Sequence, residues 1–254
     1  MENQKTALSI VAHPDDTEFQ CAGTLALLYR EGWKIISATM TPGQAGSAEL
    51  PPEEISAIRH KEAANAVALL NGEYHCLESE DIFIMYDRET LLKTIGLIRR
   101  VKPAVVFTAS PSDYMVDHEV VGKITRTACL AACIPNIKTA GADTLATVPY
   151  LYYCDPFQGK DIYGKEIEAA FFVDISSTME IKEKMLSCHK SQRDWLYKIS
   201  GVNEYVIMMK EFAARRGKNI NRPYAEGFRQ NLGYNYPSDN VLKAVLGELV
   251  FDVK

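Results

Sequence analysis

Several absences narrow the classes of protein to which this chain can belong. The net charge is −5 and no cluster of Lys and Arg stands out, so the sequence has no electrostatic footprint of nucleic-acid binding. Its N-terminal residues lead into an apolar run that is too short for a signal peptide or a membrane span. We therefore expect a cytoplasmic protein that binds neither nucleic acid nor membrane.

The cysteines also lack a pattern. Six Cys residues are scattered through apolar segments, and no CxxC pair occurs among them. Cys129 and Cys133 lie four residues apart on a predicted helix, which does not favour a Cys-based zinc site. This distribution predicts buried, reduced thiols, as is typical of cytoplasmic proteins.

Low-complexity linkers and internal repeats are absent as well. The 254 residues suit one large α/β domain, or such a domain with a modest annex. We expect a single domain, with a core over residues 1–140 and a C-terminal α+β annex over residues 141–254 packed on it. The first strand-to-helix turn lacks the Gly-x-Gly-x-x-Gly fingerprint, so nucleotide binding is a weak alternative.

What the first half does contain is an alternation of short apolar runs and apolar-periodic segments. Short runs bounded by turn residues predict strands, and the periodic segments predict helices. The strands are expected at 7–12, 33–40, 74–77 and 104–108, and the helices at 20–31, 53–70 and from about 91 to before Pro103. Strands separated by such helices imply parallel crossovers and a three-layer α/β/α sandwich.

The second half is less regular. Two strands are predicted at 150–154 and 170–174, and a helix is predicted at 204–216. Between them, the residues from Ser177 to Glu180 read as a capping box that introduces one helix continuing towards Trp195.

Polar residues follow the first predicted strand where it ends. His13, Asp15 and Asp16 lie in the loop at its carboxyl end, and in an open α/β sheet that edge is where ligands bind. Imidazole and carboxylate are plausible ligands for zinc, but a third donor is needed. Taken alone, the segment could equally be a turn whose Asp side chains cap the next helix.

The third donor is expected in the loop after the fourth strand, which opens on the same edge of the sheet. His118 stands at the start of the following helix, with Asp117 as a candidate cap. Two His and one carboxylate with an open position form the ligand set of a hydrolytic zinc centre.

These motifs resemble those of the LmbE-like (PIG-L) zinc deacetylases. The resemblance covers roughly residues 6–230 and is carried by Ala12-His13-Pro14-Asp15-Asp16, Gly23-Thr24, Arg59 to Ala64, Asp117-His118, His189 to Gln192, and Tyr224 to Arg229. It implies a Rossmann-like fold and hydrolysis of an N-acyl group, most often the N-acetyl group of a glucosamine derivative. The expected partner is thus a small N-acylated amino sugar or its conjugate, and we expect a homo-oligomer.

The resemblance also implies roles for the residues of the first motif. One zinc ion per chain would be held by His13, Asp16 and His118, with Asp15 as general base and zinc-bound water as nucleophile. Two adjacent carboxylates suit this division, because one can bind the metal while the other takes the proton and returns it to the leaving amine.

Other residues are candidates for supporting roles, each with a plain structural alternative. Arg59, Asp113, Tyr114 and His189 are candidate substrate contacts, and Glu62 and Asp117 are candidate supports for the site. Arg59 and Glu62 could instead form an exposed ion pair on a helix border, Asp113 could start a turn, and His189 could serve packing.

Met115 departs from the family pattern, which has a His three residues before the second imidazole ligand. A thioether cannot donate a hydrogen bond, and losing one oxyanion donor typically costs roughly 100- to 1,000-fold in rate. Tyr114 or His189 could replace the donor. The alternatives are a metal-binding protein with little or no turnover, or an amidase for another acyl amine such as a thiol conjugate.

Overall fold

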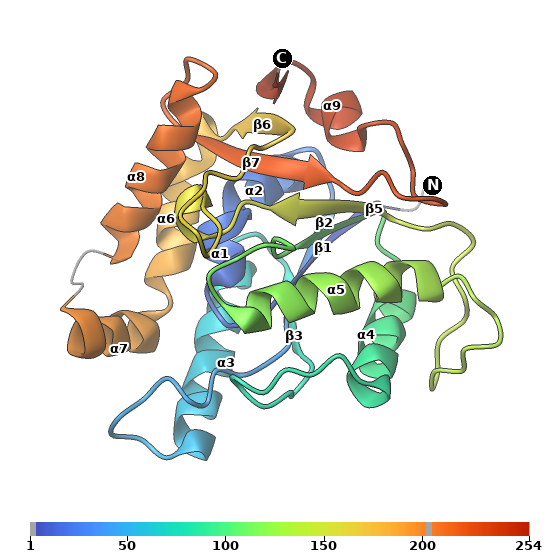
Figure 1. Ribbon diagram of the computed structural model, residues 1–254, viewed down its shortest axis with the longest axis horizontal. Helices are drawn as coiled ribbons and strands as arrows, with labels where there is room; N and C mark the ends of the chain where they lie inside the picture. Colours follow the sequence, from blue (N-terminus) through green and yellow to red (C-terminus); the bar gives the residue numbers. More distant parts are fainter. Residues whose placement is uncertain (1–3, 202–204, 254) are drawn as a thin grey trace.

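A single mixed sheet forms the centre of the molecule (Figure 1). The computed structural model describes residues 4–201 and 205–253. Among these residues the sheet has eight strands in the order β3-β2-β1-β4-β5-β7-β6-β8. The strands are β1 (Thr6–Val11), β2 (Lys34–Thr39), β3 (Glu73–Cys76), β4 (Val105–Thr108), β5 (Tyr150–Cys154), β6 (Phe171–Asp174), β7 (Ala225–Gln230) and β8 (Val250–Asp252).

The first five strands are parallel and the remaining three are antiparallel to their neighbours. β1 pairs in parallel with both β2 and β4, and β7 runs antiparallel between β5 and β6. The order β3-β2-β1-β4-β5 reverses direction between β1 and β4, and in a doubly wound sheet this switch point is where ligands bind. The predicted α/β class with a mainly parallel sheet is confirmed.

Helices cover both faces of the sheet, which makes three layers (Figure 1). The described helices are α1 (Asp16–Gln20), α2 (Ala22–Arg30), α3 (Pro52–Ala68), α4 (Arg88–Val101), α5 (Val116–Ala131), α6 (Met179–Ser187), α7 (Lys190–Ser200), α8 (Tyr205–Lys218) and α9 (Val241–Leu246). Buried side chains of α2, α3, α6, α8 and α9 belong to one apolar cluster, and those of α4 and α5 belong to the other. None of the described helices is long and apolar enough to cross a membrane.

The alternation of side chains along the central strands produces the two clusters. In β4, Val105 and Phe107 join the first cluster whereas Val106 joins the second. Neighbouring side chains of a strand point to opposite faces, so a continuous apolar run is what a strand covered on both sides requires.

The second half departs from the sequence-based prediction in several places. The helix expected to run to Trp195 is two helices, because His189 (φ −85°, ψ 62°) is not helical and separates α6 from α7. The capping box is wrong: α6 begins at Met179 without a side-chain cap, and the Ser177 hydroxyl accepts a hydrogen bond from Arg30 (3.1 Å) instead. Strands β7 and β8 and helix α9 were not predicted. The expected helix start at Glu204 lies outside the described residues, and the division at residue 140 stays a prediction.

Candidate metal centre and its cavity

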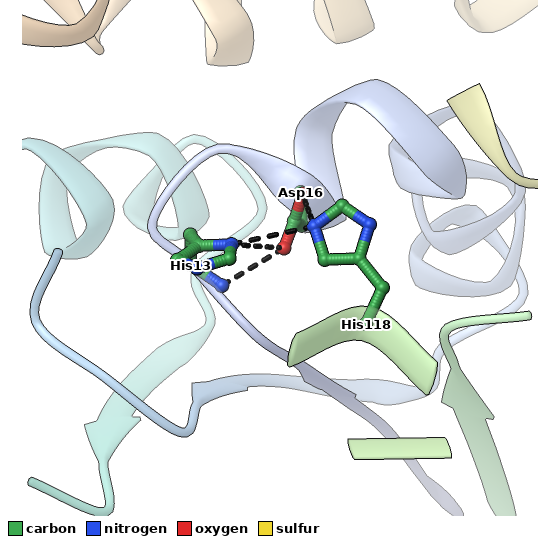
Figure 2. A group of neighbouring side chains, drawn as sticks. All are labelled: His13, Asp16 and His118. Atoms are coloured by element: carbon green, nitrogen blue, oxygen red, sulfur yellow. Dashed lines mark hydrogen bonds and ion pairs between the residues drawn. The ribbon is translucent and has the colours of Figure 1, made fainter. Parts of the chain in front are cut away.

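Two loops at the switch point bring together side chains that are far apart in the sequence. The loop after β1 carries His13 and leads into α1, which begins with Asp16, while the loop after β4 leads into α5 and places His118 in its first turn. Because β1 and β4 are parallel neighbours, both loops leave the same edge of the sheet. Figure 2 shows the three side chains pointing toward one another.

The three side chains present donor atoms at the spacing that a tetrahedral metal needs. His118 Nε2 lies 3.3 Å from His13 Nδ1, and the carboxylate of Asp16 lies 3.3 Å from His13 Nδ1 and 3.4 Å from His118 Nε2 (Figure 2). Tetrahedral ligands at about 2.0–2.1 Å from zinc are separated from one another by about 3.3–3.4 Å. His13, Asp16 and His118 therefore fit a divalent metal of this size.

Carboxylates also face the ring nitrogens that point away from this centre. Asp113 Oδ1 lies 3.0 Å from His118 Nδ1. Asp81 Oδ1 and Asp117 Oδ2 lie 3.1 and 3.4 Å from His13 Nε2. A carboxylate behind a metal-binding imidazole fixes the ring orientation and its tautomer and raises its basicity.

The charges of the group favour an ionised metal ligand. Burial alone would raise the pKa of Asp16, but His118 and His13 outweigh it and hold the pKa at about 2. The pKa of His118 is raised although burial lowers it, because the carboxylates of Asp16 and Asp113 face the ring. A divalent metal would take the place of the protons that these imidazoles attract.

Asp15 is the neighbouring carboxylate that does not belong to this group of donors. Its backbone is left-handed (φ 106°, ψ −23°), a conformation that a non-Gly residue adopts only when its surroundings enforce it. Burial and the charge of Asp16 raise its pKa to about 6. The Tyr205 hydroxyl donates a hydrogen bond to Asp15 Oδ2. Such a carboxylate can exchange a proton near neutral pH.

The candidate metal ligands and Asp15 open into one cavity of about 900 Å³. Its wall is largely apolar and aromatic, with polar groups near the metal-binding residues. The apolar lining includes Phe19, Ile82, Tyr114, Met115, Phe157, Ile162, Trp195, Leu196, Tyr205 and Met208, and the polar lining includes His13, Asp15, Asp16, Arg59, Asp81, His118, Lys160, Asp161 and Gln192. A cavity of this size is large enough to enclose a ligand bigger than a single acetyl group.

The four candidate substrate contacts lie in three different places around the cavity. Arg59 and Tyr114 lie on the cavity wall. Asp113 lies behind His118, which differs from the substrate contact expected above. His189 is buried, with its Nε2 atom 3.2 Å from Glu18 Oε2.

The two candidate supports also have defined contacts. Glu62 accepts hydrogen bonds from the backbone N–H (2.9 Å) and the hydroxyl of Ser191, so it fastens the N-terminus of α7. Asp117 accepts from the backbone N–H of Ile82 (2.9 Å). The expected cap at Asp117 is wrong, because α5 begins at Val116 and Met115 occupies the cap position without a side-chain hydrogen bond.

Two residues of the site were missed by the sequence-based reasoning. Asp81 follows β3, whose carboxyl end lies at the same edge of the sheet, so the rule that found His118 could have found it. Tyr205 begins a helix whose apolar stripe resembles any core helix, and the sequence holds no signal for its contact with Asp15.

The chain is similar in sequence to proteins of known activity. Residues 8–129 match the family model described as PIG-L: GlcNAc-PI de-N-acetylase. The chain is similar to the diacetylchitobiose deacetylase of Thermococcus kodakarensis, with 26% identity over 237 residues that cover 89% of this chain and 82% of the relative. It is similar to the 4-oxalmesaconate hydratase of Pseudomonas putida, with 25% identity over 239 residues that cover 89% of each.

A solved structure resembles the fold over almost the whole chain. The N,N'-diacetylchitobiose deacetylase from Pyrococcus horikoshii, in complex with an inhibitor, superposes with a TM-score of 0.77 at 24% identity and covers 94% of this chain and 90% of its own.

Proposed function

Because the chain belongs to the LmbE-like (PIG-L) family, we propose that it is a zinc-dependent hydrolase that removes an N-acyl group, in the first place an acetyl group, from an amino sugar or its conjugate. The convergence of His13, Asp16 and His118 carries this proposal. Three donors at tetrahedral spacing, with carboxylates behind both imidazoles, support a catalytic metal with an open position.

The residues around this group suit amide hydrolysis. A bound zinc ion would supply acidity to water and polarise the amide carbonyl. Asp15, with a pKa raised to about 6 by burial and by Asp16, would take a proton as water attacks and return it to the leaving amine. Arg59 and Gln192 on the cavity wall would hold polar groups of the sugar, and the apolar wall would exclude bulk water.

The proposal is tested by metal analysis and by an amine-release assay. Purified protein should hold about one zinc per chain and release amine from one or more N-acetylated amino sugars. His118→Ala should lose the metal, whereas Asp15→Ala should keep it and lose turnover. His75→Ala is a matched control, because His75 lies in β3 near Glu73 and away from the cavity. A chain that holds no metal contradicts the proposal.

Hydration of an unsaturated acid is the second candidate. Arg59 is 3% exposed on the cavity wall, and its Nε has no hydrogen-bond partner among the described residues. A buried guanidinium of this kind suits a substrate carboxylate. The hydratase relative and the absence of a donor at Met115 favour the same reaction.

An assay of both substrate classes distinguishes N-acyl hydrolysis from hydration. Unsaturated oxo-dicarboxylic acids would lose their conjugated ultraviolet absorbance on hydration, while N-acetylated amino sugars would remain intact. Zinc binding without either reaction would favour a metal-containing binding protein, and release of amine only from thiol conjugates would favour the other amidase.

A further inference from the structure

Helix α8 brings a phenol into the cavity beside the metal-binding group. Tyr205 is the first residue of α8, is 6% exposed, and lies 190 positions from Asp15 in the sequence. Its hydroxyl donates to Asp15 Oδ2. Within residues 4–201 and 205–253, no other group donates a hydrogen bond to the Asp15 side chain. The proposed general base is therefore contacted from the C-terminal half of the chain.

The ring of Tyr205 is held by the same short helix that follows Asp15. Tyr205 stacks on Phe19 of α1, with ring centroids 6.0 Å apart and an interplanar angle of 27°. Phe19 lies in α1 four residues after Asp15, and its backbone N–H donates to the carbonyl of Asp15 (2.9 Å), so the ring on which Tyr205 stacks is tied to the backbone of Asp15. The stack thus aims the hydroxyl back at the carboxylate.

Asp15 has a particular need for such a contact. Its left-handed backbone persists only where neighbours fix it, and the carboxylate of Asp16 stands beside it. A hydrogen bond to one oxygen stops the carboxylate from turning freely.

The other donors considered from the sequence have different contacts. Tyr114 is 58% exposed and its ring meets His118 edge-on, with centroids 5.5 Å apart. His189 faces Glu18. Met115 lines the cavity, but its side chain carries no N–H or O–H to donate.

We propose that Tyr205 is the positioning residue of the general base, holding one oxygen of Asp15 so that the other remains available to water in the cavity. This inference rests on the proposed hydrolysis, since it takes Asp15 as the base. It assigns to α8 a part in catalysis that neither metal-binding loop supplies.

The kinetic test removes the hydroxyl and keeps the ring. Tyr205→Phe should lower kcat about 10- to 100-fold, the effect of losing one hydrogen bond to a charged group, while KM and zinc content stay unchanged. Tyr152→Phe is the matched control, because it removes a hydroxyl that donates to Asn240 (2.9 Å), outside the cavity. An unchanged kcat, or a loss that appears in KM or in metal content, overturns the proposal.

A second test needs no activity. Thermal unfolding of chelator-treated protein is measured for the wild type, Tyr205→Phe, Asp15→Ala and the double variant. The Tm shift caused by Tyr205→Phe should disappear when Asp15 is already Ala, because the two residues are coupled. Additive shifts contradict the link between the residues, whereas a wild-type protein that releases no amine contradicts the proposed hydrolysis instead.

Discussion

Each candidate metal-binding imidazole uses one ring nitrogen toward the shared centre and faces a carboxylate with the other. For His118 this carboxylate is Asp113, which is buried and also accepts the backbone N–H of Met115 (3.1 Å). Asp113 is thus placed to support His118, although it does not line the cavity.

Asp113→Asn tests this pairing. The amide keeps the shape but loses the charge that makes the imidazole more basic, so zinc affinity should fall about 10- to 100-fold. Competition with a coloured chelator measures the affinity. Asp252→Asn, an exposed residue paired with Lys243, should bind zinc like the wild type. Equal affinities for the two variants would contradict the support role of Asp113.

A buried ion pair lies behind the site. Lys182 Nζ contacts Glu226 Oε1 at 2.5 Å and the carbonyl of Phe19 at 2.8 Å, and both side chains are buried. Glu226 also accepts the backbone N–H groups of Gly23 (2.9 Å) and Thr24 (2.8 Å), so it satisfies the first turn of α2.

Lys182→Met should destabilise the fold by about 3–5 kcal/mol, because it leaves the Glu226 charge buried without its partner. Urea unfolding measures the change. Lys184→Met on the same helix is the control, since its pair with Glu180 is exposed to solvent and should contribute little to stability. Similar losses for both variants would show that burial does not set the strength of the Lys182 pair.

At the level of elements, the break between α6 and α7 places a separate short helix on the cavity. Gln192, Trp195 and Leu196 of α7 line the wall, and Glu62 of α3 holds the N-terminus of this helix through Ser191. The helix therefore depends on a side chain from a distant segment.

Glu62→Ala should loosen α7 and raise KM about fivefold, the equivalent of about 1 kcal/mol for a lost cap, with zinc content unchanged. Steady-state kinetics with an active N-acetylated substrate measures this. Glu180→Ala removes an exposed carboxylate of α6 and should leave KM unchanged. A loss of zinc in Glu62→Ala would place Glu62 in the metal site instead.

The sequence predicts an element well when the element follows from the pattern of its own residues, and poorly when it depends on contacts with distant residues. The strands and helices of the first half follow from apolar periodicity, and their bounds differ by a few residues from the prediction. Strand β7 escapes because Glu226 and Arg229 interrupt its pattern, and Glu226 is tolerated there only through contacts with α2 and Lys182. Such contacts join residues that are 203 and 44 positions apart, which no local window includes.

At the scale of the whole molecule, the topology explains which site residues can be inferred. His13, Asp16 and His118 follow from the rule that parallel strands end at a common edge, although their roles stay a prediction. Tyr205 reaches Asp15 because α8, which lies between β6 and β7 in the chain, packs on Phe19 of α1. That placement depends on the whole fold.

Metal removal should lower the stability of the whole protein. Five carboxylates gather around the centre, namely Asp15, Asp16, Asp81, Asp113 and Asp117, and a divalent ion would offset their repulsion. Zinc at about 100 times its dissociation constant should stabilise chelator-treated protein by about 2.7 kcal/mol. Thermal unfolding with and without added zinc checks this, and His118→Ala should not respond. An equal response from that variant would locate the ion elsewhere.

Two different parts of the chain line the cavity. Loops after the parallel strands contribute the ion's prospective ligands, whereas α7, α8 and residues 157–164 contribute much of the remaining wall. Substitutions in these later segments would therefore change which molecule fits the cavity, while the metal-binding residues stay the same.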